Sequence, residues 1–164
     1  MKIDSSKKPN IPYDDWTIES HDTSLGKIDP TKIELYLDES QKSGYIEGNK
    51  LLGKLKDKPV LNATVLDYLF EHQELIPESW KGKYVYFWGT VYHGSSGNLY
   101  VRCLYFYDGA WRRDSDWLDI GWFGSAPAAL LASPSSSESK SLVLEKRVKE
   151  LELDMKKLRE IIKF

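Results

Sequence analysis

The chain has 164 residues and a mass of 18.9 kDa, and 13% of its residues are aromatic, which suits one globular domain with its own core and an appended segment. A formal net charge of −2 and a pI near 5.9 exclude the strong positive charge with which proteins bind nucleic acid or anionic membranes. No apolar stretch is long enough for a transmembrane helix, and the first residues lack the apolar run of a signal peptide.

The cysteine content indicates a reducing compartment. Cys103 is the single cysteine, so an intrachain disulfide is impossible and a cytoplasmic protein is the default expectation. Export by a route other than the general secretory one would leave no trace in this sequence.

Helices are expected in the first half of the chain, after a polar segment of residues 1–26 that is expected to be irregular. Asp29 and Pro30 form an N-cap followed by proline at the first helical position, and a helix that begins there would end at Gly44. Its apolar residues would share one face: Ile33, Tyr36 and Leu37.

Two further helices are predicted, over residues 47–56 and from residue 63 to about residue 74. Pro59 separates them, and Asn62 caps the second. The apolar residues of the second recur at spacings of three and four, the mark of an amphipathic helix packed against other structure: Val65, Leu66, Leu69 and Phe70.

Strands are predicted next. Residues 84–93 alternate with period two, residues 94–98 have the composition of a hairpin loop, and residues 99–107 form the partner strand before an Asp108-Gly109 turn. One face holds Val85, Phe87 and Val91, and the other holds Tyr84, Tyr86, Trp88 and Tyr92. The sequence thus predicts an α+β domain over residues 27–133, in which N-terminal helices pack on a small antiparallel sheet.

The last part of the chain has a different pattern. Residues 134–141 are a Ser-rich linker, and residues 142–164 carry a heptad repeat typical of a parallel coiled coil, as a dimer or a trimer. About three heptads are marginal as a lone helix, so association would stabilise them. The alternative is a single amphipathic helix folded back on its own domain. The core positions of the heptads are Leu144, Val148, Leu151, Met155, Leu158 and Ile162.

The sequence gives no positive indication of catalysis, a metal site or a cofactor. The three histidines lie far apart in the predicted elements: His21, His72 and His93. Asp114, Asp116 and Asp119 cluster, but the Gly and Glu of a calcium-binding loop are missing. An enzyme or small-molecule site built on these carboxylates is one alternative function, and it would need at least two of them, or one with His93, in one closed pocket.

Residues 84–137 contain no Lys, Glu, Gln or Met, although the chain is rich in Lys and Glu on both sides. Exposed surfaces usually recruit Lys and Glu, so ordinary surface selection does not explain this composition. Small, acidic, basic and aromatic residues separate Trp111, Trp117 and Trp122. Such mixtures are typical of recognition surfaces, where aromatic residues provide contact area and Ser, Gly, Asp and Arg adjust specificity.

A run of residues, VLNATVLDYLFEHQELIPESWKGKYVYFWGTVY, is followed by VRCLY, an Asp-Gly turn, spaced tryptophans, WLD and PAALLAS. Over roughly residues 25–133, these motifs resemble the variable proteins of diversity-generating retroelements, notably the small ones of candidate-phyla bacteria. In such systems a reverse transcriptase copies a template with errors at adenines, and the copy replaces a variable repeat near the 3′ end of the target gene. Asn codons are the usual targets, and Lys, Glu, Gln, Met and Trp cannot be reached from them.

The Asn-rich tail of this family can be laid on residues 106–129. Constant positions of the family pattern are unchanged here: Asp108, Gly109, Trp111, Trp117, Leu118, Asp119, Trp122, Pro127, Ala128 and Ala129. Positions where the pattern has Asn hold residues that adenine changes can reach: Tyr107, Arg112, Asp114, Asp116, Ile120, Phe123, Ser125 and Ala126. The chain also departs from the pattern at other positions: Phe106, Ala110, Arg113, Ser115, Gly121 and Gly124. Adenine changes alone do not explain Phe106, Ala110 and Arg113.

The resemblance implies a receptor-like binding protein, not an enzyme, that recognises a protein or other macromolecule through a variable region at about residues 104–126. It implies no cofactor and no metal, and many relatives use a C-type-lectin-like fold, the leading specific expectation here. The ligand-binding residues would be Tyr107, Arg112, Arg113, Asp114, Ser115, Asp116, Ile120, Gly121, Phe123, Gly124, Ser125 and Ala126. The scaffold residues would be Trp111, Trp117, Leu118, Trp122 and Pro127. A coiled-coil assembly protein, with the domain as a cap, is a further alternative.

Overall fold

The computed structural model describes residues 2–132; residue 1 and residues 133–164, with the predicted linker and heptad segment, lie outside this description. Residues 2–131 belong to one compact unit. Strands contain 34% of them and helices 24%. The prediction of an α+β domain with helices packed on a small sheet is therefore wrong, because a large curled sheet is the main element.

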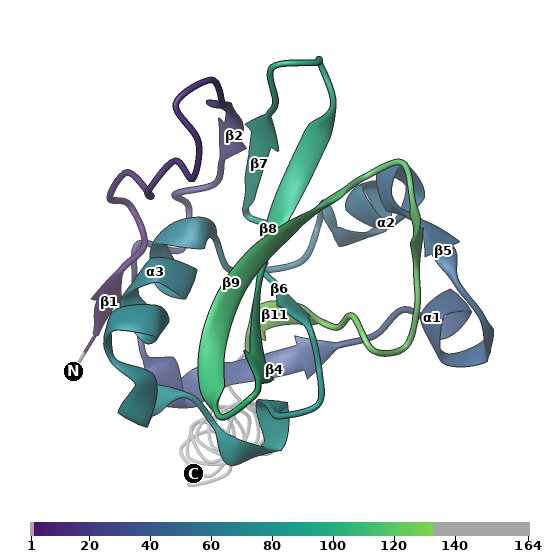
Figure 1. Ribbon diagram of the computed structural model, residues 1–164. Helices are drawn as coiled ribbons and strands as arrows, with labels where there is room; N and C mark the ends of the chain where they lie inside the picture. Colours follow the sequence, from purple (N-terminus) through teal and green to yellow (C-terminus); the bar gives the residue numbers. More distant parts are fainter. Residues whose placement is uncertain (1, 133–164) are drawn as a thin grey trace, which may run out of the picture. The chain divides into compact units, whose positions relative to one another are not determined.

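The principal sheet has seven strands in the order β2-β7-β8-β6-β11-β4, with β9 paired to β8, and it curls as a half-barrel (Figure 1). Its members are β2 (Thr17–His21), β4 (Ile33–Tyr36), β6 (Val85–Tyr86), β7 (Thr90–His93), β8 (Leu99–Tyr107), β9 (Ala110–Trp117) and β11 (Ala128–Leu131). Two small ladders accompany it: β1 (Ile3–Asp4) with β3 (Lys27–Ile28), and β5 (Ile46–Glu47) with β10 (Gly121–Trp122). The pair of β6 and β11 is parallel, whereas the other pairs are antiparallel.

The predicted strand over residues 84–93 is divided into β6 and β7. The division occurs at residues 87–89, where the backbone of Gly89 lies so close to Asn62 that an added Cβ would be 2.9 Å from the Asn62 Cα. This break changes the alternation, so Val91 packs with Trp88 in one core and not with Val85 in the other. Both short strands then pair with β8.

Three α-helices are present among the described residues: α1 (Glu39–Ser43), α2 (Gly48–Leu55) and α3 (Ala63–Glu71). Short 3-10 turns, η1 (Pro30–Lys32), η2 (Gln73–Leu75) and η3 (Glu78–Trp80), connect other elements. The predicted helices at residues 47–56 and 63–74 are confirmed as α2 and α3, and the Asn62 side chain caps α3 by accepting a hydrogen bond from the Val65 N–H.

The predicted continuous helix from Asp29 to Gly44 is wrong, although its expected end is confirmed, because Gly44 is the C-cap residue of α1. The Asp29 carboxylate does accept a hydrogen bond from the Thr31 N–H, but only η1 follows before the chain extends into β4. β4 pairs with β11 from Ile33↔Leu131 to Tyr36↔Ala128. This long-range pairing overrides the local helical spacing. The first 26 residues also differ from the expected irregular segment, because β2 forms an edge of the principal sheet.

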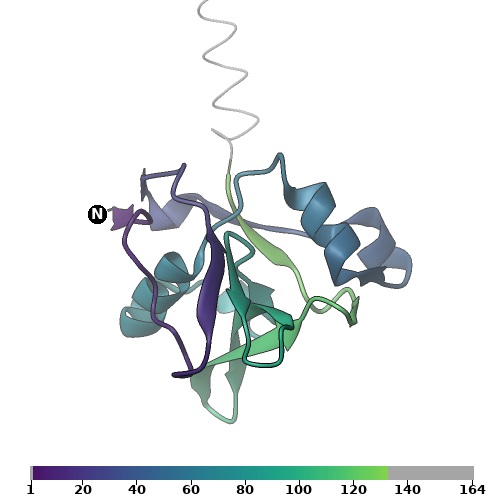
Figure 2. The same ribbon diagram turned by 90° about the horizontal axis from the view of Figure 1, so that it is seen from above.

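Two cores lie on the two faces of the sheet, and α2 and α3 lie on opposite sides of the β8–β9 hairpin (Figures 1 and 2). The α2 core includes Leu51, Leu55, Trp88, Val101, Cys103, Leu118 and Trp122. The α3 core includes Leu61, Val65, Leu66, Leu69, Val85, Phe87 and Leu104. Successive residues of β8 alternate between the two cores, so the register of β9 against β8 decides which of its side chains lie on each side. No helix within residues 2–132 has the length and apolar character of a membrane span.

Candidate functional site

The β8–β9 hairpin is the element that positions the predicted ligand-binding residues. The two strands pair without a register shift from Tyr100↔Trp117 to Tyr107↔Ala110. Asp108 and Gly109 make the two-residue turn with φ values of 49° and 77°, the left-handed backbone that such a turn requires. Paired residues project to the same side of the sheet, so this register assigns each side chain of β9 to one face.

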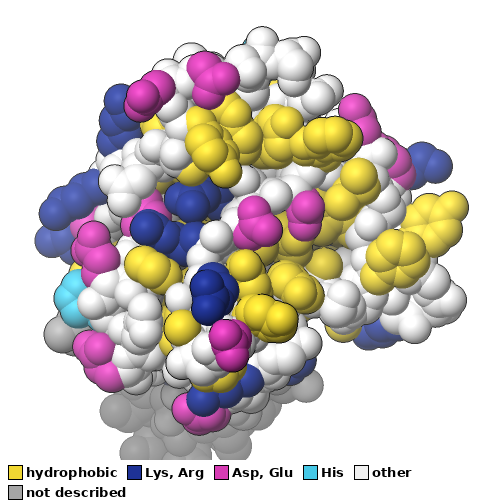
Figure 3. Space-filling model, viewed as in Figure 1, with side chains coloured by type: hydrophobic (Ala, Val, Ile, Leu, Met, Phe, Trp, Pro, Cys, Tyr) yellow, Lys and Arg dark blue, Asp and Glu magenta, His cyan; other side chains and the backbone are white. Residues whose placement is uncertain are grey.

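One face of the hairpin carries Arg112, Asp114 and Asp116 of β9 next to Tyr105 and Tyr107 of β8. The segment after β9 adds further predicted residues beside Asp116, around one cavity. We call the following set the Asp116 face: Tyr107, Arg112, Asp114, Asp116, Ile120, Phe123, Ser125 and Ala126. Ala126 is buried, Asp116 is half-buried, and the others are exposed, with Tyr107 at 65% and Phe123 at 56%. Acidic side chains lie among hydrophobic ones over this part of the molecule (Figure 3).

The opposite face of β9 carries Arg113 and Ser115, which the sequence had grouped with the ligand-binding residues. Arg113 Nη1 donates a hydrogen bond to Asp67 Oδ1 at 3.0 Å, and its guanidinium lies 4.0 Å from the ring centroid of Phe70 in α3. Arg102 of β8 is the second cation near Asp67, at 3.6 Å. Arg113 therefore belongs to an ionic network between the sheet and α3, and not to the Asp116 face.

A cavity of about 170 Å³ lies on the Asp116 face, where β9 ends and the following segment begins. Asp116 of β9 lines this cavity together with the buried side chains of Tyr86 and Trp122. The Tyr86 hydroxyl donates a hydrogen bond to Asp116 Oδ2. Burial raises the pKa of this phenol far above its ordinary value of 10.0, and the nearby Cys103 and Asp116 raise it further, so Tyr86 stays a hydrogen-bond donor at any physiological pH.

The main chain of the segment between β9 and β11 is held by hydrogen bonds to its carbonyl groups. The Gly48 N–H donates to the Ile120 carbonyl at 3.1 Å, and the Tyr84 N–H donates to the Ser125 carbonyl at 2.8 Å. Gln41 Nε2 donates to the carbonyl oxygens of Phe123 and Ala126, at 3.1 and 2.9 Å. Since all four acceptors are main-chain carbonyls, a change of side chain at these positions leaves the hydrogen bonds available.

The five predicted scaffold residues differ in how deeply they are buried. Leu118, Trp122 and Pro127 are buried, and the Trp122 ring packs against those of Tyr86 and Trp88, at centroid distances of 4.3 and 4.8 Å. Trp111 is half-buried, with its ring 5.2 Å from that of Phe106. Trp117 is 50% exposed, so its predicted role as a scaffold residue is not supported by burial.

The three aspartates that cluster in the sequence do not meet around one site in the structure. Asp119 Oδ1 accepts a hydrogen bond from Asn49 Nδ2 at 2.8 Å, Asp114 is exposed, and His93 lies on β7. Among these residues, only Asp116 lines the cavity. Within residues 2–132, no group of three or more His, Cys, Asp or Glu side chains is placed to hold a metal ion. Burial raises the pKa of the Cys103 thiol to about 12, which fits a core residue.

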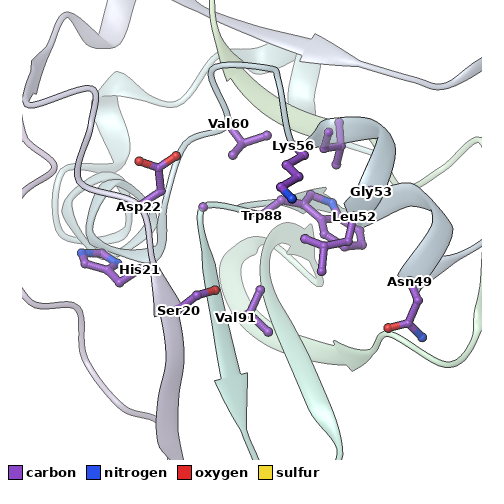
Figure 4. A pocket seen from close by; sticks show the side chains of 12 residues that line it. Ser20, His21, Asp22, Asn49, Leu52, Gly53, Lys56, Val60, Trp88 and Val91 are labelled. Carbon is purple, nitrogen blue, oxygen red and sulfur yellow. The ribbon is translucent and has the colours of Figure 1, made fainter.

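A larger cavity, of about 560 Å³, lies between α2 and the β2–β7 pair (Figure 4). Trp88, Leu52 and Val91 form its apolar part, and Lys56 and Asp22 lie at its polar part. No predicted ligand-binding residue lines it. Its volume lies in the range of small-molecule sites, but its polar groups carry opposite charges and do not select one class of ligand.

Sequence reasoning missed several residues of the site: Gln41, Tyr45, Tyr84 and Tyr86. Period-two alternation placed Tyr84 and Tyr86 on one strand face, which was a usable signal. Gln41 and Tyr45 reach the site through long-range contacts, such as the 5.5 Å centroid distance between the rings of Tyr45 and Phe123. No family model, curated protein or solved structure matches this chain.

Proposed function

We propose that this chain is a diversified ligand-binding protein of the kind that diversity-generating retroelements produce. The Asp116 face is its recognition surface, and the partner is a protein that the residues at the varied positions select. The proposal assigns recognition, and no catalytic step, to these residues.

One observation carries the proposal. The eight positions at which the family pattern has Asn lie on one side of the molecule: those on β9 share a sheet face with Tyr107 of β8, and those after β9 line one cavity together with Asp116. Along β9 they take every second position, 112, 114 and 116, on one side of the sheet. Five of the eight line the cavity of about 170 Å³: Asp116, Ile120, Phe123, Ser125 and Ala126. Arg113 and Ser115, which are not Asn positions, lie on the opposite side.

The surroundings of these residues favour tolerance to change. The backbone of the varied segment is held by hydrogen bonds that its main-chain carbonyls accept, and Leu118 and Trp122 anchor it in the α2 core. Substitutions of exposed side chains away from such contacts usually change stability by no more than about 0.5 kcal/mol. A surface of this kind can change its chemistry while the fold is kept.

The heptad repeat of residues 142–164 completes the proposal. If it joins several copies in a parallel coiled coil, weak individual sites gain avidity, provided that they can reach the partner together. A truncation after Ser133 is expected to leave a folded monomer that binds its partner weakly, and molar mass measured by light scattering reports the oligomer.

The DNA beside the gene tests the proposal. We expect a near-identical repeat with adenines at the codons of the eight residues, next to a reverse-transcriptase gene. The codons for Leu118 and Trp122 serve as internal controls and should be the same in both repeats. A flanking region without such a repeat, or with differences spread equally over the control codons, would contradict the proposal.

A further inference from the structure

We infer that the Asp116 cavity binds one arginine side chain of a protein partner. The inference rests on the proposed function for the nature of the partner, but the cavity itself supplies the chemistry. With a volume of about 170 Å³, it is smaller than the roughly 300–1,000 Å³ of typical small-molecule sites. It therefore suits a single side chain of a ligand whose remaining surface covers the rest of the Asp116 face.

The charged group in the cavity is the carboxylate of Asp116, and one of its two oxygens accepts no hydrogen bond from a described residue. Asp116 Oδ2 accepts the hydrogen bond of the Tyr86 hydroxyl, and among the described residues Asp116 has no ion-pair partner and no donor to Oδ1. The orientation of the carboxylate is set by Tyr86, which is 3% exposed. An ionised acceptor that is fixed before binding forms a charge-assisted hydrogen bond with little loss of side-chain entropy.

The cations near Asp116 are engaged elsewhere. Arg112, on the same face, donates from Nε to the carbonyl of Tyr107 at 3.0 Å and lies over the ring of Tyr107. Arg113 is on the opposite face, where it pairs with Asp67. Asp114, two residues from Asp116 on the same face, adds a second negative charge. The cavity and its surroundings thus attract a positive group.

Aromatic rings around the carboxylate favour guanidinium over other cations. Tyr84 and Phe123 line the cavity and are 44% and 56% exposed, so parts of their rings remain available to a ligand. A planar guanidinium stacks on aromatic rings and donates two parallel hydrogen bonds to a carboxylate, whereas an ammonium acts as a strongly hydrated point charge. Tyr45, next to Phe123, extends the aromatic wall beyond the cavity.

The test is an NMR titration of the full-length protein with three probes of nearly equal size. They are N-acetylarginine methylamide, N-acetyllysine methylamide and the uncharged N-acetylcitrulline methylamide. We expect the arginine probe to shift the amide signals of Asp116 and of residues 120–126 at millimolar concentration, and the citrulline probe to shift none of them. Equal shifts with citrulline, or tighter binding of the lysine probe, would overturn the inference.

Two variants complete the experiment. Asp116→Asn keeps the volume and an acceptor for Tyr86 but removes the charge, and it should weaken binding of the arginine probe about fivefold, the upper end of what an exposed ion pair contributes. Asp114→Asn removes the neighbouring charge outside the cavity and should weaken binding by less than about twofold. If both variants bind the probe alike, the cavity is not the site. The flanking DNA tests the proposed function independently, so a failed titration beside a matching repeat would reject arginine recognition alone.

Discussion

The hydroxyl of Tyr86, a core residue, donates a hydrogen bond to the carboxylate of Asp116, which lines the cavity on the Asp116 face. Tyr86 is held in turn by Trp122, whose ring lies edge-on to it at a centroid distance of 4.3 Å. The family pattern makes Trp122 constant and Asp116 variable. The contact therefore joins the part of the molecule that holds the fold to the part that we propose recognises a partner.

Trp122 and Trp117 are expected to differ in their effect on stability. Trp122 is 2% exposed and Trp117 is 50% exposed. Trp122→Ala should lower the free energy of unfolding by about 3–5 kcal/mol, because it leaves a cavity in the core, and Trp117→Ala by less than about 1 kcal/mol. Urea unfolding followed by circular dichroism measures both. Equal losses would show that burial does not separate the two tryptophans.

Gly48 and Gly53, both in α2, should respond to alanine with opposite signs. A Cβ at Gly48 would lie 2.0 Å from the Leu118 carbonyl oxygen, whereas a Cβ at Gly53 would have no atom within 4 Å. Gly48→Ala should destabilise the protein by about 1–3 kcal/mol through overpacking, and Gly53→Ala should stabilise it by about 0.5–1 kcal/mol through helix propensity. Thermal unfolding of the two variants checks this. A neutral Gly48→Ala would mean that α2 does not pack closely on the segment after β9.

Asp67 is expected to be the most sensitive carboxylate in the described part of the chain. It accepts hydrogen bonds from Arg113 and from the Asn10 N–H, at 3.0 and 2.8 Å, and Arg102 lies 3.6 Å away. Asp67→Ala would leave the buried Arg102 without its counter-charge and should cost about 3–5 kcal/mol of unfolding free energy.

The exposed Asp114 is the matched control for Asp67. Asp114→Ala should change the unfolding free energy by no more than about 0.5 kcal/mol. Guanidinium would screen the ion pairs, so both variants are compared in urea. A mild effect of Asp67→Ala, close to that of Asp114→Ala, would contradict the structural role of the network.

Asp38 should make stability depend on pH in acid. Burial acts to raise the pKa of Asp38, but hydrogen bonds from Ser40 and Lys54 outweigh burial and hold the pKa below its ordinary value of 3.8. A lowered pKa in the folded state means that the unfolded chain binds the proton more tightly, so this contribution is complete above the ordinary value and is lost as the pH falls through the folded value.

The variant Asp38→Asn tests this pH dependence, since asparagine can still cap α1. The difference in unfolding free energy between the native protein and the variant should be constant above about pH 5 and should shrink between about pH 4 and pH 2. Urea unfolding over this range measures it. A difference that stays constant down to pH 2 would contradict the lowered pKa.

Elements defined by local patterns were predicted well, and elements defined by distant partners were not. α3 has its cap and its apolar spacing within a dozen residues, and the turn at Asp108 and Gly109 is set by the residues that tolerate positive φ. β4 was mistaken for a helix because Ile33, Tyr36 and Leu37 share a helical face, and its partner β11 lies almost a hundred residues later. β2 is a polar edge strand without an alternating apolar pattern.

The residues of the candidate site show the same difference between local patterns and long-range contacts. The predicted binding residues 112, 114 and 116 lie on one side of β9, whereas Arg113 and Ser115, which were predicted together with them, lie on the opposite side because side chains alternate along the strand. The contribution of Tyr86 could be inferred only after β6 was placed next to β8, because its hydrogen bond to Asp116 crosses the sheet.

The most direct test of the account compares two displayed libraries of the full-length protein. One randomises the eight residues of the Asp116 face, and the control randomises eight exposed positions elsewhere: Thr17, Glu19, Glu34, Lys50, Glu71, Gln73, Glu74 and Ser95. The measurement is the frequency of protease-resistant members that bind any of several unrelated proteins. We expect such binders from the Asp116-face library and few or none from the control. Equal frequencies, or loss of protease resistance throughout the Asp116-face library, would contradict the claim that this face varies while the fold is kept.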